Sequence, residues 1–296
     1  MSFEEFTDYI LRHVLIDWKE EASVSLQKVM KNNGTVYTGL HIREREGNMI
    51  PAIYLEPYYD KYKKGDSLYS IIRELRENYE WAMTRMGSYD FDLADYNSVK
   101  DKLIYRLVNY EKNKDMLNSC PHIRLEDLAL TFRWLAHEDS IGISTALVTF
   151  QELELWDVTG EDILLDAQRN TRRLFPEKVM LFDELFCSYM DDDYEWDDYI
   201  PMYIVTNRQQ INGACVILYD DFLKEFVQKN PGDYYVLPSS IHEMILVPAD
   251  RVKNPESLKN IVHDANRTVV NEDEYLSDSV YYYDSEEDNI SLASFV

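Results

Sequence analysis

The sequence has only three cysteines in 296 residues, and they are far apart. Cys120, Cys187 and Cys215 form no C-x-x-C pair. Neither a disulfide framework nor a cysteine-based zinc site is therefore expected. We expect these residues to be reduced thiols, most of them buried.

Basic residues are also scarce, since 30 Lys and Arg stand against 55 Asp and Glu, a formal net charge of −25. A surface that neutralises nucleic-acid phosphates or anionic lipid is not expected on such a chain. The acid is concentrated in residues 181–200 and 271–296, each with eight acidic and no basic residues. We therefore expect no direct contact with nucleic acid or with a membrane.

Long apolar runs are absent, and none approaches the roughly 20 residues that a membrane-spanning helix needs. The first residues, Met1-Ser2-Phe3-Glu4-Glu5, are acidic, whereas a signal peptide begins with basic residues. These features predict a soluble, cytoplasmic protein.

What the sequence does contain is typical of a folded chain, with 45% hydrophobic residues and 23 tyrosines. We predict the α+β class in two domains, residues 1–115 and 116–296. The first begins with a helix to about residue 17 and continues as a three-stranded meander, with Asn33-Gly34 as a hairpin turn. Amphipathic helices are expected at residues 68–86 and 98–112.

The second predicted domain is one mixed sheet with helices packed on it. Residues 125–130 fit either a helix or a strand. The spacing predicts strands at residues 144–150, 202–206, 214–219, 234–237 and 244–247, and helices at 159–174, around 222–227 and at 255–266. Residues 181–200 form an acidic loop in this interpretation, and residues 280–292 a hairpin within the acidic C-terminal segment 271–296.

Several short sequence segments, which follow one another along the chain, resemble those of a known family. They are K-N-N at residues 31–33, Y-T-G-L at 37–40, I-Y-L-E at 53–56, A-Q-R-N-T-R-R-L-F-P at 167–176, T-N at 206–207, N-G-A at 212–214, L-P-S-S-I-H-E at 237–243 and L-S-D-S-V-Y at 276–281. Over most of its length the chain resembles the domain of unknown function family DUF5688. The resemblance implies an origin in anaerobic Gram-positive gut bacteria and their mobile elements, and it supplies no activity.

One cluster combines nucleophile, base and acid side chains, namely Ser239, Ser240, His242 and Glu243. In an extended strand Ser240 and His242 would point to the same face, close enough for a hydroxyl–imidazole hydrogen bond. Glu243 would point to the opposite face, so another group would have to orient the imidazole. The alternative is that these side chains satisfy backbone groups at the start of a strand.

No preformed metal site is predicted. A zinc-protease helix needs a second histidine four positions after His242, where Leu246 stands. An EF-hand loop beginning at Asp191 would need glycine at Trp196 and glutamate at Met202. We therefore predict neither a metal nor any other cofactor.

Two further groups are candidate binding residues. The acidic segment interleaves carboxylates with aromatic rings, which suits contact with a protein, although a solvated loop is the alternative; its residues are Asp191, Asp192, Asp193, Tyr194, Glu195, Trp196, Asp197 and Asp198. Arg172 and Arg173 could bind an anion, or could offset the dipole at a helix C-terminus.

These observations favour a non-enzymatic, acidic protein-binding module. A nucleic-acid-binding protein with a basic surface is one class of partner, because an acidic face can imitate the charge pattern of DNA. The rival hypothesis is a hydrolase or transferase that uses Ser240 with His242. A third is that the acidity serves solubility alone.

Overall fold

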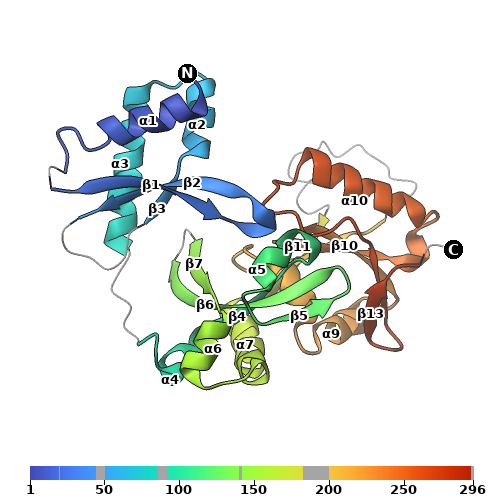
Figure 1. Ribbon diagram of the computed structural model, residues 1–296. Coiled ribbons are helices and arrows are strands. Elements are labelled where there is room, and N and C mark those ends of the chain that lie inside the picture. Colours follow the sequence, from blue (N-terminus) through green and yellow to red (C-terminus); the bar gives the residue numbers. More distant parts are fainter. Residues whose placement is uncertain (20, 45–50, 86–91, 140–141, 183–199, 295–296) are drawn as a thin grey trace. The chain divides into compact units, whose positions relative to one another are not determined.

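The computed structural model describes residues 1–19, 21–44, 51–85, 92–139, 142–182 and 200–294 (Figure 1). The chain divides into two compact units, Met1–Asp90 and Phe91–Val296. This division lies before the domain boundary expected near residue 115, because the strand at residues 103–109 pairs within the second unit.

The first unit is a three-stranded antiparallel sheet with helices. Its elements are α1 (Phe3–His13), β1 (Ser23–Met30), β2 (Val36–Arg43), β3 (Ala52–Tyr54), α2 (Glu56–Lys63) and α3 (Leu68–Arg85). The strand order β1-β2-β3 confirms the predicted meander. Asn33 and Gly34, in the short turn η1 (Asn32–Gly34), have φ of 59° and 71°, the left-handed region that a tight hairpin turn requires.

Local sequence signals explain the helices of this unit. Ser2 and Glu5 form a capping box at the start of α1. The helical stripe of α3 supplies Ile71, Leu75 and Tyr79 to the core. They pack there with residues in or next to α1, β2 and α2, namely Phe6, Ile10, Val14, Leu40, Ile42, Leu55 and Tyr58.

The second unit contains two antiparallel sheets. The four-stranded sheet has β4 (Leu103–Asn109), β6 (Leu128–Asp139) and β5 (His122–Leu125) in that order, and β7 (Gly142–Leu147) also pairs with β6. The six-stranded sheet has the order β13 (Asn289–Leu292), β12 (Tyr281–Asp284), β10 (Tyr234–Ser240), β11 (Glu243–Pro248), β9 (Tyr203–Asn207) and β8 (Glu177–Leu181). The α+β class is confirmed, and two antiparallel sheets replace the single mixed sheet that we expected.

Helices and short helical turns complete the second unit. The α-helices are α4 (Tyr96–Val99), α5 (Lys114–Leu117), α6 (Phe150–Trp156), α7 (Gly160–Leu174), α9 (Phe222–Lys229) and α10 (Glu256–Thr268). The 3-10 turns are η2 (Lys100–Lys102), η3 (Glu111–Asn113), η4 (Gly213–Leu218) and η5 (Ala249–Arg251). Thr159 caps α7, which begins where the sequence predicts a helix, and β12 and β13 form the expected C-terminal hairpin.

Two predicted elements were wrong. The helix expected at residues 98–112 is mainly strand β4, whose residues are buried on both faces. A doubly buried strand is apolar at consecutive positions and so also satisfies helical spacing. The strand expected at residues 214–219 is η4, whose Ala214 N–H donates to the Ile241 carbonyl, 3.2 Å away.

Asp127, between β5 and β6, connects the two sheets of the second unit. Its carboxylate accepts hydrogen bonds from the hydroxyl groups of Ser277, Ser279 and Tyr281, which lead into and begin β12. The Asn109 amide donates to the nearby Leu276 carbonyl, 2.9 Å away. The residues of the segment L-S-D-S-V-Y therefore hydrogen-bond the C-terminal segment to the four-stranded sheet.

No helix among the described residues combines the length and apolar character needed to cross a membrane.

Gly213 lies where a side chain has no room, and its replacement gives the first prediction. A Cβ atom there would lie 2.2 Å from Thr206 Oγ1 and 2.6 Å from the His242 carbonyl oxygen. Gly213→Ala should therefore lower the free energy of unfolding by about 2 to 4 kcal/mol, measured by urea denaturation. Gly160→Ala is the matched control, because nothing lies within 4 Å of the added Cβ. Equal stability of the two variants would contradict the close packing of η4.

Candidate functional site

The predicted Ser–His cluster lies in the two-residue connection between β10 and β11. Ser240 ends β10, Glu243 begins β11, and Ile241 and His242 form the turn. The Ser240 hydroxyl accepts a hydrogen bond from the backbone N–H of His242 at 3.0 Å. Ser240 therefore contacts the backbone of His242, as the structural alternative proposed.

The His242 imidazole is held by two other parts of the chain. Its Nδ1 accepts a hydrogen bond from the backbone N–H of Asn212 at 3.0 Å, so this nitrogen carries no proton. Its Nε2 lies 3.5 Å from a carboxylate oxygen of Glu274. Because Nδ1 already accepts this backbone hydrogen bond, Nδ1 is not free to act as a base for a serine hydroxyl.

The other two residues of the cluster pair with each other. The Ser239 hydroxyl donates to Glu243 Oε1 at 3.1 Å. The four candidates thus form two separate local contacts, and the structure does not bring them together as nucleophile, base and orienting acid.

Arg172 and Arg173 both bind acceptors within the protein. Arg172 donates to both carboxylate oxygens of Glu177, at 3.3 and 2.9 Å, and to the Asp220 carbonyl at 2.6 Å. Arg173 donates to the Asp101 carbonyl at 2.9 Å. These contacts tie the end of α7 to its neighbours, and anion binding by the pair stays a prediction without support from this geometry.

The contacts of α7 within the protein account for all four residues of the segment N-T-R-R at 170–173. Besides the two arginines, the Asn170 amide donates to the Lys100 carbonyl at 2.7 Å. The Thr171 hydroxyl accepts the backbone N–H of Tyr105 at 3.0 Å. Thr171 thus satisfies a backbone donor on β4, which is an edge strand that pairs with β6 within the described ranges.

Residues 191–198, the predicted acidic contact segment, lie outside the described residues, as does Cys187. Cys120 and Cys215 are free and buried, as expected. Burial raises the pKa of Cys120 to about 11 and that of Cys215 to about 12. Both are neutral thiols near pH 7 and are poor nucleophiles in that form.

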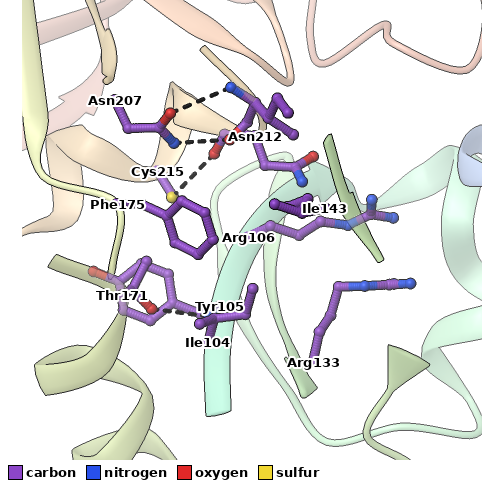
Figure 2. A pocket seen from close by; sticks show the side chains of 11 residues that line it. Ile104, Tyr105, Arg106, Arg133, Ile143, Thr171, Phe175, Asn207, Asn212 and Cys215 are labelled. Carbon is purple, nitrogen blue, oxygen red and sulfur yellow. Dashed lines mark hydrogen bonds between the residues drawn. The ribbon is translucent and has the colours of Figure 1, made fainter. Parts of the chain in front are cut away.

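A different group of side chains, which the sequence analysis missed, forms a pocket in the second unit. Arg106 of β4 lies opposite Thr131 of β6, and Arg133 follows two residues later on β6. Because side chains alternate along a strand, Arg106 and Arg133 are diagonal neighbours on one face of the sheet. Figure 2 shows both side chains, with Ile143 beside Arg106.

Neither arginine has a carboxylate partner within the part of the chain that the structure describes. The Arg133 side chain donates to Thr145, with Nε 2.7 Å from the hydroxyl and a terminal nitrogen 3.2 Å from the carbonyl. Arg106 Nε is fully buried and has no hydrogen-bond partner among the described residues. A buried donor without an acceptor costs roughly 1–3 kcal/mol, and more on a charged group.

The pKa values of both guanidinium groups reflect this surrounding. Burial, together with the nearby charge of Arg133, lowers the pKa of Arg106 to about 9. Burial lowers the pKa of Arg133 to about 10. Both groups nevertheless remain positively charged at neutral pH.

The pocket beside these arginines is small and has mixed walls. It encloses about 260 Å³ of empty space, including the part open to solvent, and its narrow interior has room for about one water molecule. Polar side chains from the segment after β9 and from α7 alternate with apolar ones. Its lining is Ile104, Tyr105, Arg106, Arg133, Ile143, Thr171, Phe175, Asn207, Ile211, Asn212 and Cys215 (Figure 2).

A sequence signal for this pocket exists in retrospect. Arg106 and Arg133 each interrupt an apolar run, L-I-Y-R-L-V and T-F-R-W-L. A charged residue inside a buried strand needs a partner or a ligand. The partner strand and its register, however, cannot be deduced from either run alone.

No group of three or more His, Cys, Asp or Glu residues within the described ranges is arranged to hold a metal ion.

The Ser240 geometry predicts a structural role for this hydroxyl. Ser240→Ala should lower the free energy of unfolding by about 1 kcal/mol, because the partly buried N–H of His242 loses its acceptor. A fluorophosphonate, which labels activated serines, should leave the wild-type protein unmodified when checked by intact-mass spectrometry. Labelling that disappears in Ser240→Ala but persists in Ser239→Ala would contradict this assignment.

The comparisons with known proteins agree with the resemblance in sequence. A family model described as a family of unknown function, DUF5688, matches residues 3–285. No curated protein and no solved structure matches the chain. Since the model covers nearly the whole chain, the protein belongs to the DUF5688 family.

Proposed function

We propose that this protein is a non-enzymatic binding protein whose acidic surface recognises a partner protein with a basic surface. The proposal is supported by the net charge of −25 and by its concentration in two segments. The separate contacts of Ser240 and His242 favour this function over the hydrolase or transferase alternative.

The turn between β12 and β13 is the observation that carries the proposal. Asp284 accepts the backbone N–H groups of Glu286 and Glu287, both at 2.9 Å, and so fixes the turn. The side chains of Glu286 and Glu287 are exposed and pair with no cation among the described residues. The turn therefore presents two uncompensated carboxylates in a fixed arrangement.

Nearby acidic side chains differ from Glu286 and Glu287, because they already form ion pairs within the protein. Asp288 lies 2.8 Å from Lys224 of α9, and Glu225 of the same helix lies 3.1 Å from Arg172. These pairs leave Glu286 and Glu287 as the carboxylates of this region available to a partner. The acidic segment 191–198 is the second proposed contact, on its composition alone.

Neutralising the acids tests the proposal. Partners are isolated on the immobilised wild-type protein, and the main partner is purified and titrated against each variant. Glu286→Gln with Glu287→Gln should weaken binding about 3- to 10-fold, since each exposed pair contributes up to about 1 kcal/mol. Replacing the six acids of segment 191–198 by amides should weaken it further, and binding should decline as salt rises.

The control is Glu256→Gln with Asp264→Asn, which removes the same charge from exposed positions on α10. This variant should bind nearly as well as the wild type. Equal binding by all variants would contradict the acidic contact. If no protein is recovered by any of them and the neutralised variants precipitate at lower concentration, the acidity serves solubility instead.

A further inference from the structure

Two partly buried positive charges, with no counterion among the described residues, are a costly arrangement. Arg106 and Arg133 share one sheet face, and the charge of Arg133 helps to lower the pKa of Arg106. Burying an ionised group without a partner costs several kcal/mol. Hydrophobic residues at both positions would complete the apolar surroundings at less cost, so stability does not explain the pair.

The hydrogen-bond partners of Arg172 show how an arginine with a structural role is bonded in the second unit. Arg172 is matched by a bidentate carboxylate and by a carbonyl. Arg133 is only partly matched, by the Thr145 hydroxyl and carbonyl. Arg106 Nε has no match within the described residues, although it is fully buried.

Asn212 supplies a third polar group to the pocket. Its backbone is fixed, because its N–H donates to His242 Nδ1 and its carbonyl accepts from Cys215 Sγ at 3.2 Å. Its side-chain amide forms no hydrogen bond with any described residue. Figure 2 shows this amide above the Arg106 side chain, facing the same part of the pocket.

We infer that Arg106, Arg133 and Asn212 form a binding site for a small oxyanion. The oxyanion would accept hydrogen bonds from the free Nε of Arg106, from the outer guanidinium nitrogens and from the Asn212 amide. Guanidinium groups bind phosphate and carboxylate oxygens in paired contacts, which are stronger than their hydrogen bonds to neutral acceptors. The apolar walls, among them Ile104, Ile143 and Phe175, exclude water and strengthen these bonds.

The charge of the two guanidinium groups and the size of the pocket indicate which class of ligand can bind. Two guanidinium groups supply two positive charges, which match a phosphate group with its charge of roughly −1.5 to −2 near neutral pH. The interior has room for about one water molecule, so only the end group of a larger ligand enters, after small shifts of the lining side chains. Phosphate is therefore the expected ligand group, and a carboxylate is the competing one.

Thermal unfolding and calorimetric titration test this site with inorganic phosphate, acetate and chloride at constant ionic strength. Phosphate should raise the unfolding temperature of the wild-type protein by about 3 °C or more at saturating concentration. Acetate should have a smaller effect and chloride none. A larger effect of acetate would identify a carboxylate site, and the same small response to all three anions would overturn the inference.

Arg106→Met keeps an unbranched apolar side chain at this position and removes the guanidinium charge. It should reduce phosphate affinity at least 100-fold, and without phosphate its unfolding temperature should equal or exceed that of the wild type, because an unpaired charge is removed. A purely structural arginine would instead lower the unfolding temperature on removal. Arg169→Met removes a largely exposed arginine and should leave the response to phosphate unchanged.

Asn212→Gly is a second variant, which tests the site even if Arg106→Met fails to fold. Asn212 has a φ of 53°, a conformation that glycine adopts without strain, so this change removes the amide and preserves the backbone. Phosphate affinity should fall about 10-fold, the loss expected for one hydrogen bond. An unchanged affinity in both Asn212→Gly and Arg106→Met would show that phosphate binds elsewhere.

Discussion

The register between β4 and β6 places Arg106 and Arg133 on one face of a sheet, beside a pocket with few acceptors for them. Much of the second unit is arranged around this constraint. The Thr171 hydroxyl holds β4 against α7, and Asp127 ties the other end of the sheet to the C-terminal segment. The backbone of Asn212, fixed by His242, sets the remaining wall. His242, which resembles a catalytic base, thus helps to position one wall of the pocket.

The exposed turn between β12 and β13 and the arginine pocket carry opposite charge. The sequence as a whole is strongly acidic, and the turn between β12 and β13 exposes unpaired carboxylates. The charges of the arginine pocket are positive, partly buried, and without a carboxylate partner among the described residues. An acidic surface suits a large basic partner, whereas a narrow cationic pocket suits a small anion. The two features therefore support separate interactions, and either can operate without the other.

The sequence predicts those elements whose signals are local. The capping boxes at Ser2 and Thr159 and the Asn33-Gly34 turn lie within a few residues of the helices and strands that they define. β4 was mistaken for a helix because burial on both faces removes the alternation typical of a strand. The arginine pocket depends on a strand register that makes neighbours of Arg106 and Arg133, 27 positions apart, which no local pattern specifies.

Nuclear magnetic resonance of the arginine side chains tests the central claim most directly, because the Nε–H groups give separate signals. On titration with inorganic phosphate, the Nε–H signals of Arg106 and Arg133, assigned by single substitutions, should shift and exchange more slowly with water. The Nε–H signal of Arg172, already bound to Glu177, should not move. Unchanged signals from Arg106 and Arg133 at saturating phosphate would contradict the account.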